Sequence, residues 1–139
     1  MEVVEMLKGT PIFSSLTQRD LRRLAKAARV QTYQTNQAIV REGQNPHGFF
    51  IIRSGKVEVI KGIDTDRPNV LRTMGPGDFF GTAALIERKP RTATVRAIED
   101  TECISIWRAD FRTELKKNPE IAVKMLSSLL HRMIEDEAG

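Results

Sequence analysis

Residues 81–95 read GTAALIERKPRTATV, and this stretch decides how the rest of the chain is interpreted. Its first half is rich in small residues, namely Gly81, Ala83 and Ala84. Small residues let backbone N–H groups approach a ligand closely, and a helical turn beginning there would direct unpaired donors and a positive dipole end at a negative charge. Arg91 supplies a fork of donors that matches two phosphate oxygens, and Thr92 adds a hydroxyl group beside it. The pattern predicts a phosphate-binding cradle.

Around this stretch, from residue 30 to residue 106, glycines separate short runs rich in Val, Ile, Phe and Thr. Such spacing is typical of many short antiparallel strands. The predicted strands are 31–34, 37–41, 48–53, 56–61, 69–74, 78–80, 92–98 and 101–106. These strands are enough for a double-sheet jelly roll. We therefore expect a mainly β protein, an eight-stranded antiparallel jelly-roll β-barrel with N-terminal helices and two C-terminal helices.

Helical patterns lie on both sides of the strands. Thr17 and Asp20, followed by apolar periodicity, predict a capped helix that begins near Gln18. A short helix is predicted over 109–117, and Pro119 suits the first turn of a last helix that ends near residue 137. The apolar band of this last helix is wider than one contact with the barrel requires. A second copy of the chain, giving a homodimer, or a downstream domain would cover the excess; the alternative is a single broad core face.

The cradle resembles, in order and spacing, the phosphate-binding cassette of the cyclic nucleotide-binding domain family. In that family Gly-Glu-Leu-Ala-Leu-Ile is followed, after four residues, by Arg-x-Ala-Thr-Val. Four other stretches are similar to family segments: PIFSSLTQRDLRRLA, IVREGQNPHGFFIIRSGKVEV, GPGDFFG and WRADFRTELKKNPEIAVKMLSSLL. The family includes the cAMP receptor protein and the protein kinase A regulatory subunit. The resemblance implies one domain over 1–139, with an N-terminal helical segment (1–29), a β-barrel (30–106) holding the cassette 81–95, and closing helices (109–137).

The resemblance also implies a regulatory domain that binds cAMP or cGMP, or another phosphate-bearing small molecule, and signals through its C-terminal helices. The implied ligand-binding residues are Gly81, Thr82, Ala83, Ala84, Arg91 and Thr92. Thr82 stands where typical members carry a glutamate that accepts hydrogen bonds from the ribose 2′-hydroxyl. Losing a hydrogen bond to a charged group, worth roughly 1.5 to 3 kcal/mol, weakens binding by about ten- to a hundred-fold. The alternative is a protein-interaction or structural domain on the same fold that has lost or changed its ligand.

Catalysis is not expected. The chain has only two histidines, His47 and His131, without the spacing of a metal site, so no metal or resident cofactor is predicted. The carboxylates form no pattern typical of a general acid and base. Cys103, the only cysteine, occupies an apolar alternation position and is expected to be a buried, inert thiol.

The formal net charge is +4, and much of the excess lies on one face of the first predicted helix. Because no aromatic residues or recognition helix accompany these charges, a solvated face is preferred to a nucleic-acid surface. The helix-turn-helix of the family's transcription-factor branch does not follow the last helix, so no nucleic-acid partner is expected for this chain as given. The N-terminus lacks a long apolar run, which argues against a signal peptide or a membrane span. A cytoplasmic protein is the expectation.

Overall fold

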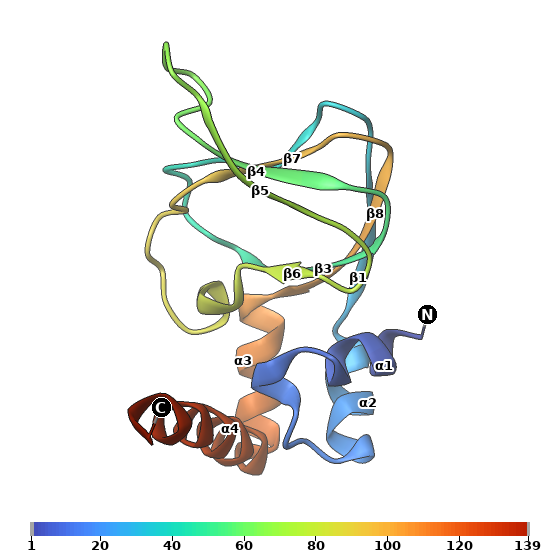
Figure 1. Cartoon of the computed structure of the whole chain (residues 1–139). Helices are drawn as coiled ribbons and strands as arrows, with labels where there is room; N and C mark the ends of the chain where they lie inside the picture. Colours follow the sequence, from blue (N-terminus) through green and yellow to red (C-terminus); the bar gives the residue numbers. More distant parts are fainter. Residues whose placement is uncertain (1, 139) are drawn as a thin grey trace. The chain divides into compact units, whose positions relative to one another are not determined.

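The computed structural model describes the backbone of residues 2–138 and the side chains of residues 2–135. The chain divides into two compact units, which are described separately (Figure 1). The sheet unit runs from Arg29 to Arg108. The helical unit combines the residues up to Ala28 with those from Ala109 onward. Whether the two units form one functional domain, as the sequence predicts, stays a prediction.

The sheet unit contains eight strands in two four-stranded antiparallel sheets. The first sheet has the order β1 (Arg29–Tyr33), β8 (Thr101–Trp107), β3 (Gly48–Ser54) and β6 (Phe79–Phe80). The second has the order β2 (Ala38–Val40), β7 (Thr94–Ala97), β4 (Val57–Lys61) and β5 (Asn69–Met74). All eight predicted strands are confirmed, with small differences at their ends. Within residues 2–138 no strand of one sheet pairs with a strand of the other, so the prediction of a closed barrel is not confirmed.

A hydrophobic cluster contributed by both sheets forms the core of this unit. Its buried members are Val40, Phe50, Ile52, Val57, Val59, Met74, Phe80, Val95 and Cys103. Phe50 and Phe80 stack with their ring centroids 5.1 Å apart. Burial, with a further contribution from the charge of Glu102, raises the pKa of the Cys103 thiol to about 12. The thiol is therefore protonated at neutral pH, and the expectation of a buried cysteine is confirmed.

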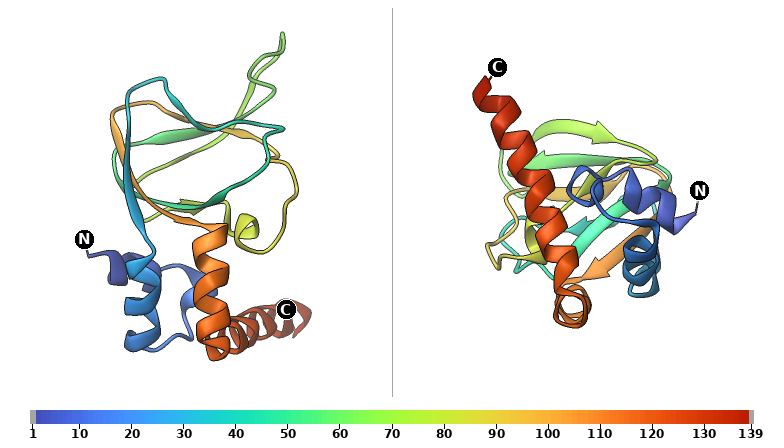
Figure 2. Two further views of the ribbon diagram at one scale, coloured as in Figure 1. Left: turned by 180° about the vertical axis from the view of Figure 1, so that it is seen from behind. Right: turned by 90° about the horizontal axis from the view of Figure 1, so that it is seen from below.

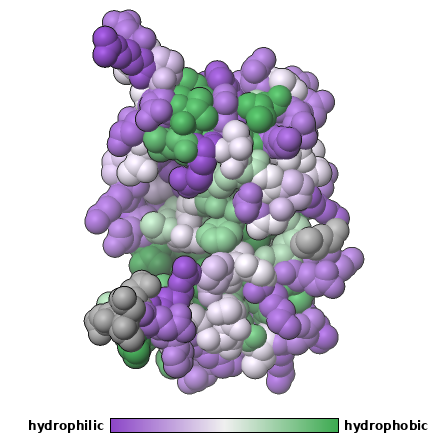
Figure 3. All heavy atoms as spheres, viewed as in Figure 1, coloured by the Kyte–Doolittle hydropathy of each residue, from purple (hydrophilic) through white to green (hydrophobic). Residues whose placement is uncertain are grey.

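The hairpin between β4 and β5 extends beyond the two sheets (Figure 1). Its tip carries exposed polar residues, including Asp64, Asp66 and Arg67. Figure 3 shows the resulting hydrophilic surface at this tip. No cluster of apolar side chains gathers there, so the tip adds nothing to the core and is suited to contact with water.

The helical unit contains α1 (Val3–Lys8), the 3-10 turn η1 (Pro11–Phe13), α2 (Gln18–Lys26), α3 (Arg108–Lys117) and α4 (Pro119–Ala138). The first residue of α3, Arg108, still belongs to the sheet unit. Asn118 separates α3 from α4, and the two helices run in clearly different directions (Figure 2). The predicted helix starts at Gln18 and Pro119 are confirmed. Phe13 and Phe111, both fully buried, pack with their ring centroids 6.3 Å apart.

Helix α4 buries only one side. Ile121, Met125 and Ser128 are buried. The exposed large apolar residues of the helix, which we call the apolar face of α4, are Val123, Leu126, Leu129, Leu130, Met133 and Ile134. The alternative of a single broad core face is therefore wrong, because most of the apolar band is not in the core. A homodimer or a downstream domain at this face stays a prediction.

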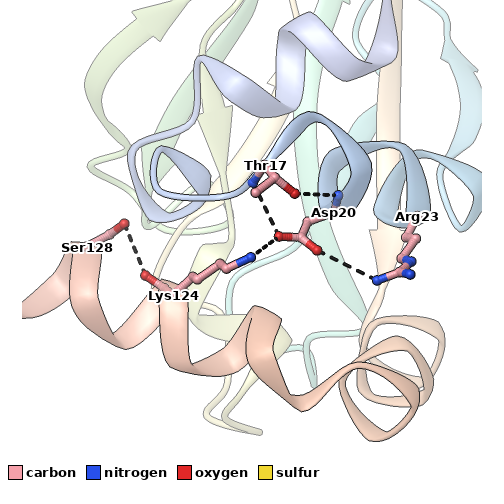
Figure 4. A network of polar contacts seen from close by, with 5 residues as sticks. All are labelled: Thr17, Asp20, Arg23, Lys124 and Ser128. Carbon is pink, nitrogen blue, oxygen red and sulfur yellow. Dashed lines mark hydrogen bonds and ion pairs between the residues drawn. The ribbon is translucent and has the colours of Figure 1, made fainter.

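A polar network built around Asp20 joins α2 to α4 inside the helical unit (Figure 4). Thr17 and Asp20 form a reciprocal capping box, in which each side chain accepts from the other's backbone N–H at 3.2 Å. The Lys124 ammonium donates to Asp20 Oδ2 at 2.7 Å, and Arg23 Nη1 lies 3.8 Å from Oδ1. Burial opposes the charge of Asp20, but the hydrogen bonds from Lys124 and Thr17 and the lysine charge hold the pKa of Asp20 below its ordinary value.

Replacing Asp20 with asparagine should lower the free energy of unfolding at pH 7 by about 1 to 3 kcal/mol, because the charge-assisted bond to Lys124 is lost. A depressed folded-state pKa stabilises the protein above the ordinary value of 3.8, and that stabilisation is lost as the pH falls through the folded-state pKa. The difference between parent and D20N should therefore shrink in acid. Urea unfolding at several pH values measures this difference. Asp66→Asn is the control, because Asp66 is exposed. A D20N difference that stays constant in acid would show that the charge is not what stabilises the network.

Candidate functional site

The first half of the predicted cradle folds as one 3-10 turn, η2 (Thr82–Leu85), which follows Gly81. Gly81 has a φ of 81°, in the left-handed region that favours glycine. A Cβ at this position would collide with the Arg91 guanidinium and would lie 3.0 Å from the Gly48 carbonyl oxygen. The missing side chain therefore lets the guanidinium pack directly against the backbone.

Two details of the turn decide which of its groups can face a ligand. Gly81, rather than Thr82, is the N-cap of η2, and no side chain caps it. The Ala84 N–H donates to the Gly81 carbonyl at 3.0 Å, whereas the Ala83 N–H has no acceptor among residues 2–138. Because η2 has only four residues, its contribution to an anion site is individual N–H groups rather than a macrodipole.

Arg91 lies in the loop before β7, which begins at Thr94 rather than at residue 92 as predicted. The loop is fixed on both sides of the residue: the Arg91 N–H donates to the Gln44 carbonyl at 2.9 Å, and its carbonyl accepts from the Gly43 N–H at 2.8 Å. The side chain donates through Nη2 to the Gly48 carbonyl at 2.6 Å. The guanidinium carbon lies 6.0 Å from the centroid of the Phe50 ring.

The charge of Arg91 is only partly compensated. The side chain is half-buried, and burial lowers the pKa of its guanidinium. In the described part of the chain Arg91 has no ion pair with a carboxylate; a neutral carbonyl and an aromatic ring are its partners. A partly desolvated cation of this kind interacts favourably with an anion that reaches it.

A cavity of about 340 Å³ brings all six predicted site residues together. The cassette residues Gly81, Thr82, Ala83, Ala84, Arg91 and Thr92 line one part of it. Apolar side chains of both sheets line the rest, among them Val40, Val59, Phe80 and Val95. The volume falls within the range of about 300 to 1,000 Å³ that is usual for small-molecule sites, and a mainly apolar lining with a few polar groups is typical of them.

Further charged residues line the cavity that the sequence patterns did not indicate as part of a site. Arg72 projects from β5, and Lys89 and Glu87 come from the loop after η2. Lys89 Nζ lies 3.6 Å from Glu87 Oε2, but both side chains are exposed, so this pair contributes little. The balance of charge at the cavity is therefore positive, which favours an anionic ligand.

Sequence reasoning also missed Arg108 and Gly48. Arg108 Nη1 donates to the carbonyl of Pro46 at 2.9 Å and lies 3.4 Å from the carbonyl oxygen of Ala84. Gly48 accepts the hydrogen bond from Arg91. The acceptors in these hydrogen bonds are backbone carbonyl groups. Because every residue has one, no residue type or spacing could have indicated these contacts.

The groups that face the cavity include a guanidinium, a hydroxyl group and backbone N–H donors. Among the described residues no group of three or more His, Cys, Asp or Glu side chains is placed to hold a metal ion. His47 packs against the ring of Trp107 with centroids 5.7 Å apart, and His131 is exposed on α4. Neither histidine lines the cavity. The fold therefore contains a positively charged, partly apolar cavity with the size and lining that are usual for small-molecule sites.

Comparison with known proteins gives the family. Residues 30–118 match the family model described as the cyclic nucleotide-binding domain. The chain belongs to the cyclic nucleotide-binding domain family.

The chain is similar to a cyclic AMP receptor protein and to a cGMP-dependent protein kinase. The chain is 26% identical over 129 residues to the cyclic AMP receptor protein of Thermus thermophilus, a match that covers 93% of this chain and 60% of that protein. It is 36% identical over 123 residues to the cGMP-dependent protein kinase, isozyme 2 forms cD5/T2, of Drosophila melanogaster, covering 86% of this chain and 13% of the kinase. The chain thus spans 60% of the first relative and a small part of the second.

A solved structure with the same fold is the regulatory domain of Toxoplasma gondii PKA in complex with cAMP. It superposes with a TM-score of 0.73 at 29% identity, over 80% of this chain and 42% of that one. Among residues 2–138, no helix is both long enough and apolar enough to cross a membrane.

Replacing Gly81 with alanine should destabilise the protein more than replacing Gly77 with alanine. Both glycines have positive φ, 81° and 89°, but a Cβ at Gly77 would meet nothing within 4 Å. Gly77→Ala should therefore lower the free energy of unfolding only by the cost of placing alanine at positive φ, about 1 to 2 kcal/mol. Gly81→Ala should lower the free energy of unfolding by that amount and by about 1 kcal/mol more, because Arg91 must move. Equal losses in urea unfolding would mean that the guanidinium does not depend on the bare backbone at Gly81.

Proposed function

We propose that this chain is a non-enzymatic regulatory domain that binds a cyclic nucleotide, cAMP or cGMP, in the cavity of about 340 Å³. The observation that carries the proposal is the state of Arg91. This half-buried cation lines the cavity and has only a carbonyl and an aromatic ring as partners among the described residues. A cyclic phosphate is the anion that would complete the pairing, because its exocyclic oxygens match the guanidinium fork.

The rest of the cavity supports the same ligand class. The N–H of Ala83 offers a donor beside Arg91, and Thr92 offers a hydroxyl group. Val40, Val59 and Val95 supply an apolar surface for the sugar and the base. The names of the relatives include both cyclic AMP and cGMP, so both nucleotides are candidates. Thr82, in place of a glutamate, predicts a weak contact with the ribose 2′-hydroxyl.

The regulatory output would pass through α3 and α4. A ligand that binds one arrangement of these helices more tightly than another shifts the population toward it, and the difference in affinity sets the size of the shift. The exposed apolar face of α4 would then serve as the output surface, and a second copy of this chain in the cytoplasm is the partner that we expect there.

A second candidate is a protein-interaction or structural domain that has lost or changed its ligand. Thr82 favours it, because the family glutamate is absent, and so does the apolar face of α4. The only partly compensated charge of Arg91 opposes it, since burying a cation without an anionic partner costs free energy.

Arg91→Ala should weaken binding of any phosphate-bearing ligand by at least about 2 kcal/mol, roughly 30-fold, because a charge-assisted pair is lost. Arg91→Lys should recover only part of the affinity, since a lysine cannot offer two parallel donors. Calorimetric titration with cAMP, cGMP and inorganic phosphate measures both. Arg88→Ala is the matched control, because Arg88 lies in the same loop but does not line the cavity. If R91A binds cAMP as tightly as the parent, the phosphate is not held by Arg91.

Thr82→Glu should raise the affinity for cyclic nucleotides by about ten-fold or more, because it restores a charged acceptor for the ribose 2′-hydroxyl. Thr82→Gln, which has the same reach without the charge, should give a smaller gain. The parent should discriminate weakly between ribose and 2′-deoxyribose ligands, and T82E should discriminate strongly. Nanomolar binding of cAMP by the parent with strong discrimination against the 2′-deoxy form would mean that another group already performs this role.

A further inference from the structure

Two arginines hold three successive carbonyl groups at the beginning of β3. The Pro46 carbonyl accepts from Arg108 Nη1 at 2.9 Å, and the His47 carbonyl accepts from the backbone N–H of Arg108 at 2.7 Å. The next carbonyl, that of Gly48, accepts from Arg91 Nη2 at 2.6 Å. The segment Pro46–Gly48 therefore fixes Arg91 and Arg108 relative to each other, although the two side chains do not share an acceptor.

The Arg108 guanidinium also reaches the far end of the cassette turn. Its Nη1 lies 3.4 Å from the carbonyl oxygen of Ala84 and 3.5 Å from that of Glu87. These residues are at the end of η2 and just beyond it. The same group thus contacts both the segment that holds Arg91 and the turn that presents the free N–H of Ala83.

The turn depends on such external contacts because its own hydrogen bonds are few. The Ala84 N–H bonds to the Gly81 carbonyl, and the N–H groups of Ile86 and Glu87 share the Ala83 carbonyl at 3.1 and 2.8 Å. A single 3-10 turn is only marginally stable by itself. Within the described chain Arg108 has no ion pair with a carboxylate, so its side-chain bonds are all to these carbonyl groups.

We propose that Arg108 is a positioning residue of the anion site, which fixes η2 against Pro46–Gly48 so that the Ala83 N–H and the Arg91 guanidinium face one ligand. Arg108 does not line the cavity and acts only through the backbone. The part of the proposal that concerns ligand affinity rests on the proposed function. The part that concerns the turn does not, because the contacts exist without a ligand.

The turn is tested first, without a ligand, by amide hydrogen exchange in Arg108→Ala. Exchange at Ala84, Ile86 and Glu87 should accelerate about ten-fold or more, because their turn opens locally. Exchange at Ile52 and Ala97, whose N–H groups bond to Asp78 and Gln37 in the sheet unit, should not change. Arg112→Ala is the matched control, since Arg112 is an exposed arginine of the same helix. Uniform acceleration at all five amides, or none, would overturn the proposal.

Ligand affinity is tested second, by calorimetry with cAMP and with inorganic phosphate. Arg108→Ala should weaken both by a similar factor of about five- to ten-fold, because the variant displaces only the phosphate side of the cavity. Arg108→Lys should recover part of the loss, and R112A should bind as the parent does. If the parent binds and R108A binds equally well despite faster exchange at η2, Arg108 does not position the site. If the parent binds neither probe, the proposed function fails, and selective exchange at η2 still supports the placement of the turn by Arg108.

Discussion

The close approach of two backbones at Gly48 is the constraint on which the site depends. Gly48 is the first residue of β3 and pairs with Trp107 at the end of β8. A side chain on Gly48 would collide with the carbonyl group of Ile106, so only glycine lets the two strands meet there. This pairing brings Arg108, the residue after Trp107, against the carbonyls of Pro46 and His47. It also leaves the Gly48 carbonyl accessible to Arg91.

The two halves of the cavity are stabilised by different forces. The apolar half belongs to the core cluster between the two sheets, where Val40, Val59, Phe80 and Val95 are buried. The polar half consists of one short turn and one loop, joined to the sheets by individual hydrogen bonds. A well-packed core changes little when a ligand enters, whereas such a loop adjusts at low cost. Conformational adjustments to different ligands should therefore occur mainly in the cassette, residues 81–95.

Much of the fold was predictable from local signals. Glycine spacing and β-branched runs indicated all eight strands, the Thr17–Asp20 pair indicated the start of α2, and Pro119 the start of α4. Closure of the barrel was not predictable, because an alternating pattern says which face of a strand is buried and not which strand lies beside it. The six cassette residues were indicated by their order in the sequence, and they line one cavity. The hydrogen bond of the Ala84 N–H and the contacts of Arg108 were not indicated, because both end on carbonyl groups that have no sequence signature.

The hydrogen bond between Arg91 and Gly48 has a kinetic consequence. A free arginine side chain samples many rotamers, and ordering it on binding would cost about 0.5 to 1.5 kcal/mol. Here the guanidinium is already held at the cavity by the Gly48 carbonyl and the Phe50 ring. If an anion binds here as proposed, the arginine needs no further ordering, and the rate of association would be set by diffusion and by the positive field of the cavity. Differences in affinity among anions would then come mainly from differences in their dissociation rates.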